Sequence, residues 1–377
     1  MKIIVAPDSY KGCLDSAAVA RHIEEGLAMA LPNSEIRKIP IADGGEGTVE
    51  AMVAGAGGTI VKCRATGPLR NETDTFFGIL ADGRTAVIEM AAISGLMLVP
   101  KNRRNPMNTT TYGTGELILE ALEHGCTEII IGVGGSATSD GGMGMAQALG
   151  IVFFDAARKP LSYGGRHMGR IKYYVDTGLD HRIRKANITV ACDVTNPFYG
   201  ESGAAYVYAR QKGANSRQVR ALDKGLRNMA LVIKETSGID VNMIAGAGAA
   251  GGLAGGLAAF TGAKLKKGFD IVADACRLEE LIKDADLVVT GEGMTDAQTA
   301  FGKAPAGIAG IAKKYNVPVI CISGSLGDGY EDVYNEGISA VFSICPGPMS
   351  LRESMKNAGK YISGTAYNAA RLFIAGK

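Results

Sequence analysis

Five short loops hold most of the residues that could do chemistry. Each combines acidic, glycine and hydroxyl-bearing residues, and most follow an apolar run that predicts a buried strand. The loops are PDSYKG from Pro7, ADGGEGT from Ala42, GGSATSDGG from Gly134, CDVTNP from Cys192 and TGEGMTDAQTAFGK from Thr290. One such loop alone is typical of a turn. Their recurrence at predicted strand ends favours one site for a polyanion and a metal, built from several loops.

The densest of these loops lies within residues 132–145, which hold six glycines, three hydroxyl side chains and one acid in fourteen residues. An apolar strand precedes it and a short helix is expected to follow. Glycines let the backbone approach a ligand closely, and the free N–H groups at a helix start attract anions. We therefore expect Gly134, Gly135 and Ser136 to contact phosphate and Asp140 to bind a metal. The alternative is a tight turn.

Four residues are candidates for the reaction itself. Asp193 ends an apolar strand and is the first candidate for the base that takes a hydroxyl proton, although an Asx turn before Pro197 would explain it equally well. Lys11 could neutralise a phosphate or a substrate carboxylate, or be a solvated loop lysine. Asp8 and Asp43 lie just past strand ends, where open α/β sheets bind ligands; helix capping is the alternative for Asp43.

The remaining candidates come from the same loops. A phosphoryl-transfer site needs N–H groups and a cation for the phosphates, carboxylates for Mg²⁺ and a base near the acceptor hydroxyl. Further predicted substrate or phosphate contacts are Ser9, Gly44, Gly45, Asn196, Gly291, Gln298 and Lys303, and further predicted metal ligands are Glu46, Glu292 and Asp296. Capping and surface charge are the alternatives.

Three familiar motifs do not explain the chain. GxxxxGK[ST] is absent, because Ala304 follows Lys303. Residues 246–251 match GxGxxG but lack a convincing preceding strand and a following acid, so small-residue packing or a phosphate contact is favoured over a dinucleotide site. No GxSxG elbow suggests a serine hydrolase.

The elements that must position these loops show two different sequence patterns. Strands alternate with helices near both ends of the chain, which predicts a parallel sheet. In residues 58–90 apolar and polar side chains alternate, which predicts antiparallel strands with a hairpin turn at 81–83. We expect an α/β fold class: a Rossmann-like domain of residues 1–64, 113–150 and 266–377, with a second mixed α/β domain of 65–112 and 151–265 inserted into it.

Composition narrows the class of protein further. The 377 residues are 46% hydrophobic, contain no Trp and have a net charge of +2, which argues against a nucleic-acid partner. No run of about eighteen apolar residues exists, so no membrane span is expected. The seven cysteines are scattered and odd in number, which favours reduced thiols and a cytoplasmic location.

Taken together, the motifs resemble those of the type I glycerate kinase family. They are APDSYKG, PIADGGEGT, TYGTGELI, GGSATSDGGMGM, CDVTNP with QKGA shortly after, GAGAAGG and TGEGMTDAQTAFGKAP, in the family's order over nearly the whole chain. The resemblance implies a Rossmann-like domain with an inserted mixed domain. It also implies phosphorylation of D-glycerate to 2-phosphoglycerate with ATP and Mg²⁺, in a cleft between the two domains.

The resemblance leaves alternatives open. They are a 3-phosphate product, another small hydroxy acid as substrate, and a non-catalytic protein that senses a nucleotide or metabolite. A homodimer is compatible with the sequence, and no membrane partner is expected. The residue roles given above follow from the loop pattern and not from the resemblance.

Overall fold

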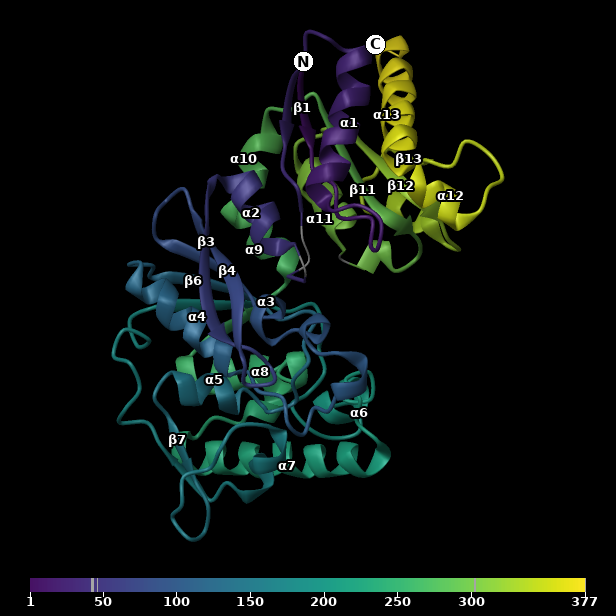
Figure 1. Ribbon diagram of the computed structural model, residues 1–377. Helices are drawn as coiled ribbons and strands as arrows, with labels where there is room; N and C mark the ends of the chain where they lie inside the picture. The colour runs from purple at the N-terminus through teal and green to yellow at the C-terminus, as the bar shows by residue number, and fades with distance from the viewer. Residues whose placement is uncertain (42–43, 46, 302, 377) are drawn as a thin grey trace. The chain divides into compact units, whose positions relative to one another are not determined.

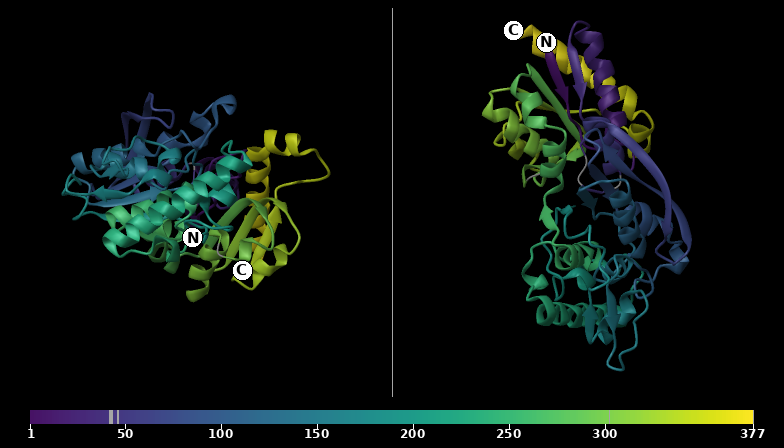
Figure 2. Two further views of the ribbon diagram at one scale, coloured as in Figure 1. Left: turned by 90° about the horizontal axis from the view of Figure 1, so that it is seen from below. Right: turned by 90° about the vertical axis from the view of Figure 1, so that its left-hand side faces the viewer.

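The computed structural model describes the chain except residues 42–43, 46, 302 and 377. It divides into two compact units. Unit 1 comprises Met1–Asp43, Glu50–Gly57 and Phe269–Lys377, and unit 2 comprises Gly44–Val49 and Gly58–Gly268. Within unit 1 the purple N-terminal and yellow C-terminal segments lie together (Figures 1 and 2).

Unit 1 is built on a five-stranded, fully parallel sheet of order β13-β12-β11-β1-β2. The strands are β1 (Lys2–Val5), β2 (Glu35–Lys38), β11 (Leu287–Thr295), β12 (Val319–Leu326) and β13 (Ala340–Ser343). If the five strands are counted 1 to 5 in chain order, their order across the sheet is 2-1-3-4-5. This is a doubly wound topology in which the strand order reverses between β1 and β11. Such sheets bind ligands beyond the carboxyl ends of the strands at that switch point.

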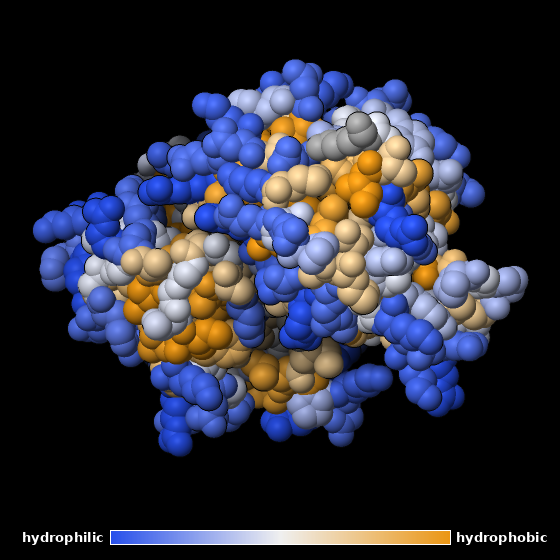
Figure 3. Space-filling view, turned by 90° about the horizontal axis from the view of Figure 1, so that it is seen from above, coloured by the Kyte–Doolittle hydropathy of each residue, from blue (hydrophilic) through white to orange (hydrophobic). Residues whose placement is uncertain are grey.

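Helices α1 (Ser16–Ala30) and α13 (Ala358–Ala375) pack together over one face of this sheet (Figure 1). Asp15 caps α1 because its Oδ1 accepts a hydrogen bond from the Ala18 N–H at 2.7 Å. The other helical segments are α2 (Thr48–Ala56), α9 (Gly268–Ala275), α10 (Leu278–Lys283), η6 (Thr299–Phe301), α11 (Ala304–Lys314), η7 (Tyr330–Tyr334) and α12 (Leu351–Lys356). Figure 3 shows hydrophobic patches on a largely hydrophilic surface, and Met29 of α1 and Leu372 of α13 are among the exposed apolar side chains.

Unit 2 contains a six-stranded mixed sheet of order β10-β9-β6-β5-β4-β3. The strands are β3 (Gly58–Thr66), β4 (Glu72–Leu80), β5 (Thr85–Glu89), β6 (Glu128–Gly132), β9 (Asn187–Ala191) and β10 (Lys264–Lys266). Strands β3, β4 and β5 pair antiparallel with one another. Strand β5 also pairs parallel with β6, and β6, β9 and β10 continue the sheet in parallel. The hairpin expected at residues 81–83 is confirmed between β4 and β5. A separate ribbon pairs β7 (Val152–Phe154) with β8 (Tyr173–Val175).

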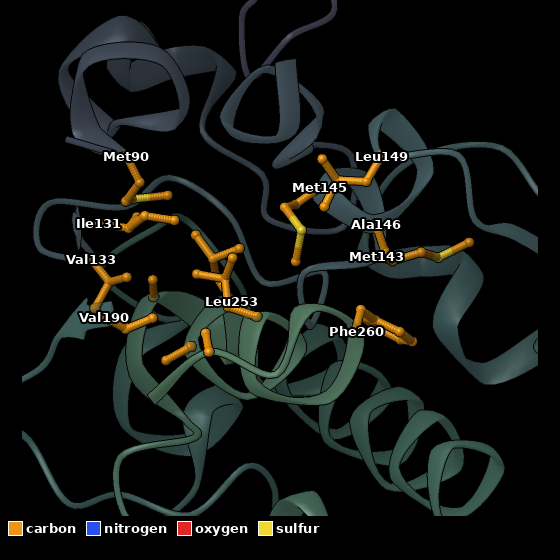
Figure 4. Packing of buried hydrophobic residues seen from close by; sticks show 14 of the residues in the cluster. Met90, Ile131, Val133, Met143, Met145, Ala146, Leu149, Val190, Leu253 and Phe260 are labelled. Atoms are coloured by element: carbon orange, nitrogen blue, oxygen red, sulfur yellow. The ribbon is translucent and has the colours of Figure 1, made fainter. Parts of the chain in front are cut away.

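The helices of unit 2 surround a large apolar core. The main ones are α4 (Tyr112–Glu123), α5 (Met143–Ala148), α7 (Ser216–Ser237) and α8 (Leu253–Thr261). Shorter segments are α3 (Ala91–Ser94), η1 (Leu96–Leu98), η2 (Lys101–Arg103), η3 (Gly165–Arg170), α6 (Ala204–Tyr208), η4 (Val241–Met243) and η5 (Ala249–Gly252). Figure 4 shows Met143 and Met145 of α5 in the buried cluster that also contains Ile131, Leu253 and Phe260.

The predicted fold class is confirmed, and the unit boundaries differ from the predicted domain boundaries: residues 44–49 and 266–268 belong to unit 2, as do two longer segments. Residues 58–64 belong to unit 2 because β3 pairs along its length with β4. Residues 113–150 also belong to unit 2 because β6 is hydrogen-bonded between β5 and β9. The glycine-rich loop after β6 is therefore part of the mixed unit and not of the Rossmann-like unit.

Candidate active site

The first group of candidate residues lies at the switch point of unit 1. The Asp8 N–H donates to the carbonyl oxygen of Gly291 at 2.8 Å, which joins the loop after β1 to the middle of β11. The carboxylate of Asp8 accepts a hydrogen bond from the Ser9 N–H at 2.6 Å, and Lys11 is exposed in the same loop. The structure thus brings Asp8, Ser9 and Gly291 together at the sheet edge where a doubly wound fold binds its ligand.

Glu292, the next residue along β11, is 6% exposed and held by hydroxyl groups. Its Oε1 accepts hydrogen bonds from Thr299 at 2.6 Å and from Thr295 at 3.3 Å. The Lys303 ammonium is 3.7 Å from Glu292 Oε2 and 3.7 Å from Asp296 Oδ1. Burial raises the pKa of Glu292, while Thr299 and Lys303 oppose that rise.

This carboxylate pair fits a magnesium ion bound partly through substrate. The described residues contain no cluster of three or more His, Cys, Asp or Glu side chains that could enclose a metal. Mg²⁺ in phosphoryl-transfer sites is usually held by only one or two carboxylates plus phosphate oxygens and water. Glu292 and Asp296, which share one ammonium, match that requirement. Gln298, the exposed neighbour, donates its backbone N–H to Asp296 at 2.9 Å.

The second group lies in unit 2, where two glycine segments cross closely. The Gly134 N–H donates to the Gly44 carbonyl at 3.3 Å. A Cβ on Gly132 would lie 2.5 Å from that carbonyl oxygen, and one on Gly134 would lie 2.8 Å from the Gly45 Cα. Side chains at these positions would clash with backbone, so the glycines are required for the approach. Asp43 and Glu46, predicted in the same segment, lie outside the described residues.

Ser136, further along the loop, contacts a lysine that the sequence analysis did not single out. The Lys212 ammonium donates to Ser136 Oγ at 2.7 Å and to the Thr138 carbonyl at 2.7 Å. Lys212 is 2% exposed, and burial lowers its pKa to about 7 against the opposing effect of Asp140. The only sequence signal for it was its place in the QKGA motif.

Asp140 belongs to the same loop, is buried, and is hydrogen-bonded to the protein itself. Its carboxylate accepts hydrogen bonds from the Thr111 N–H at 2.9 Å, from the Thr111 hydroxyl at 3.0 Å, and from the N–H groups of Gly142 and Gly144 at 3.3 Å each. A metal at Asp140 would have to displace these bonds. The environment therefore favours a structural role for Asp140 over the predicted metal-binding role.

Asp193 and Asn196 follow β9 and differ in accessibility. Asp193 is exposed, and its Oδ1 accepts a hydrogen bond from the Gly268 N–H at 3.0 Å. Asn196 donates to the Ser202 carbonyl at 2.8 Å and accepts from the Tyr208 hydroxyl at 2.6 Å. Asp193 is thus placed where a substrate could reach it, whereas Asn196 mainly braces its own loop.

The sequence profile of the glycerate kinase family matches residues 3–374. This chain belongs to the glycerate kinase family. It is therefore a kinase, and the resemblance seen in its motifs is confirmed. Glycerate 2-kinase of Escherichia coli K12 is 48% identical over 376 residues, spanning 100% of this chain and 99% of the relative. Glycerate kinase of Halalkalibacterium halodurans is 48% identical over 368 residues, spanning 98% and 97%.

A solved structure agrees with this assignment. The crystal structure provisionally assigned as glycerate kinase 2 from Salmonella typhimurium LT2 superposes on the kinase with a TM-score of 0.91 and 48% sequence identity. The match covers 100% of this chain and 99% of that one. Within the part of the kinase that the structure describes, no helix has an apolar stretch long enough to cross a bilayer.

Proposed function

We propose that this kinase transfers the terminal phosphoryl group of ATP to the 2-hydroxyl of D-glycerate, giving 2-phosphoglycerate and ADP. The observation that carries the proposal is the full-length, 48% identity to a relative named glycerate 2-kinase. The similarity extends over 376 residues, so it covers the whole chain rather than an isolated motif.

In this proposal, unit 1 handles the phosphates. Glu292 and Asp296 would hold Mg²⁺, which neutralises charge on the phosphate oxygens when bound. Lys303, 3.7 Å from both carboxylates, and Lys11 would supply further positive charge. Asp8, Ser9 and Gly291 would contact substrate at the switch point, and Gln298 would add a polar contact. The transition state carries dispersed negative charge, so such positioned cations would do much of the catalysis.

Unit 2 would supply the remaining contacts. The backbone of Gly44, Gly45, Gly134 and Gly135, with the Ser136 hydroxyl, would bind an anionic group of a substrate. Asp193 would accept the proton from the attacking hydroxyl, and Asn196 would keep its loop in place. Asp43 and Glu46 stay predictions made from the sequence.

The test is a direct assay of the purified protein with ATP, MgCl₂ and D-glycerate. We expect ADP release that depends on D-glycerate, with L-glycerate and buffer as controls, and the ³¹P spectrum of 2-phosphoglycerate. A 3-phosphoglycerate spectrum would establish the other regiochemistry. ADP release with a different small hydroxy acid but not with D-glycerate would reject the proposed substrate.

The proposal extends to the surroundings of the enzyme. The cytoplasmic location expected from the cysteine pattern fits a chain whose seven cysteines are all free. The homodimer remains a prediction, and light scattering on a sizing column measures it directly.

A further inference from the structure

Lys212 is a buried cation whose hydrogen-bond partners are neutral. Its ammonium is held by one hydroxyl oxygen and one carbonyl oxygen, both at 2.7 Å. The ion pairs found among the described residues do not include one from Lys212 to a carboxylate. Asp140 acts on Lys212 through charge, but its hydrogen bonds go to Thr111, Gly142 and Gly144, so the cost of burying the ammonium is only partly offset. Stability alone therefore gives little reason to place a lysine here, and a bound anion would give one.

The loop that Lys212 contacts also contains unsatisfied hydroxyls. Among the described residues, Thr138 Oγ1 and Ser139 Oγ are buried and have no hydrogen-bond partner. Both residues are 0% exposed, and they are consecutive. Buried polar groups in native proteins are nearly always paired, and exceptions cluster where a ligand or a catalytic role explains them. This is a second observation, independent of Lys212, that points to a ligand at the loop.

The two sides of this contact are held rigidly. On the lysine side, Gly213 has φ +96°, and a Cβ there would lie 2.3 Å from the Arg104 carbonyl oxygen. On the loop side, Gly251 has φ +70°, and its Cβ would lie 2.1 Å from the carbonyl oxygen of Thr138. This close approach accounts for Gly251 in the GAGAAGG motif. Thr138 is thus held both by Lys212 and by the segment carrying Gly251, so the loop cannot shift freely.

We propose that Lys212 is the positioning residue of the glycine-rich loop, and that it holds Ser136 so that the serine hydroxyl donates to an anionic oxygen of a substrate. Because Ser136 Oγ accepts the bond from Lys212, its own proton is left for an outside acceptor. A hydroxyl that accepts a charge-assisted bond is also a stronger donor. This inference rests on the proposed function and specifies how unit 2 recognises an anion.

The anionic oxygen has two possible sources with the same chemistry: a phosphate of ATP or the carboxylate of glycerate. Steady-state kinetics separate them. We expect Lys212→Met to raise the KM of one substrate about tenfold or more, with a smaller change in kcat, because a hydrogen bond to a charged group is lost. A higher KM for ATP identifies phosphate, and a higher KM for D-glycerate identifies the carboxylate.

A double-mutant cycle tests whether Lys212 acts through Ser136. We expect Ser136→Ala to raise the KM of the same substrate, and Lys212→Met with Ser136→Ala to be little worse than either single variant. Lys224→Met, at an exposed lysine of α7, should leave both KM values unchanged. If Lys212→Met does not fold, a folded Ser136→Ala variant with both KM values unchanged still overturns the proposal.

Other outcomes also overturn it: unchanged KM values for folded Lys212→Met, or effects of the two substitutions that simply add. Failure of the proposed function would look different, because the wild-type protein would then not turn over D-glycerate. In that case calorimetric titration of MgATP and of D-glycerate into wild type and Lys212→Met decides. Weaker binding of one of them supports the role of Lys212, and equal dissociation constants reject it.

Discussion

Asp193 and Glu292 are both acidic, yet their surroundings suit them to different tasks. Asp193 is exposed after β9, where a hydroxyl group can reach it. Glu292 is 6% exposed, and burial raises the pKa of its carboxyl. An exposed carboxylate suits proton acceptance, and a buried one beside a second acid and an ammonium suits a metal.

For Asp193 the prediction concerns turnover. We expect Asp193→Asn to lower kcat by about 10²–10⁴-fold, because the amide cannot take the hydroxyl proton. Its amide oxygen can still accept the bond from Gly268, so the fold should persist. Circular dichroism and kinetics measure both effects, with the exposed Asp176→Asn as the matched control. Near-normal turnover in Asp193→Asn would reject this residue as the base.

For Glu292 the prediction concerns pH. The Thr299 hydroxyl bond lowers the pKa of Glu292, so Thr299→Val should raise that pKa. If the ionised carboxylate is needed to hold Mg²⁺, activity should then be lost at a higher pH as the solution is acidified. The acidic limb of the kcat/KM profile should therefore move to higher pH in Thr299→Val and stay in place in Thr299→Ser. Superimposable profiles for all three proteins would contradict the role given to Glu292.

At the scale of elements, α1 and α13 approach each other through a glycine. A Cβ on Gly26 of α1 would lie 2.1 Å from the Ser363 carbonyl oxygen of α13. Gly364, one residue further along α13, is exposed and has nothing within 4 Å of its ideal Cβ. The two glycines sit in the same pair of helices, but only the first is required by packing.

This contrast predicts opposite effects on stability. Gly26→Ala should lower the free energy of unfolding by about 1–3 kcal/mol, because the methyl group forces the helices apart. Gly364→Ala should raise it by up to about 1 kcal/mol, because alanine favours a helix interior more than glycine does. Urea denaturation measures both variants. Equal effects of the two substitutions would show that the crossing of α1 and α13 is looser than the structure indicates.

At the scale of the whole molecule, the apolar cores are not reinforced by disulfide bonds between the described residues. All seven cysteines are free: Cys345 is exposed, and Cys126, Cys276 and Cys321 are buried. Burial raises the pKa of Cys276 and of Cys321 to about 11 in each case, which disfavours their reactive thiolate forms. The kinase should therefore behave as a reduced protein in which burial protects three of the seven thiols.

Thiol titration measures which cysteines are accessible in the folded protein. We expect dithiothreitol to leave the denaturation midpoint unchanged, and a disulfide reagent to label Cys345 first in the native protein. Cys126, Cys276 and Cys321 should react only after unfolding, and Cys345→Ser should remove the fastest phase. A midpoint lowered by dithiothreitol, or labelling of Cys321 as fast as that of Cys345, would contradict the buried arrangement.

Local patterns in the sequence were sufficient for the fold class, the hairpin between β4 and β5, and the family. Hydrophobic periodicity and turn chemistry act over a few residues, so they can be read from the chain directly. The place of Asp8 just past a strand was also expected, and β1 ends at Val5.

Only the tertiary structure decided which sheet carries the glycine-rich loop and what surrounds its side chains. β6 joins the mixed unit because its hydrogen-bonding partners are β5 and β9, and strand pairing between distant segments leaves no local trace. Lys212 meets Ser136 across 76 residues, and Asp140 turns inward to Thr111 across 29 residues. Burial and partner choice belong to the packed chain, because they depend on neighbours that the fold alone brings together.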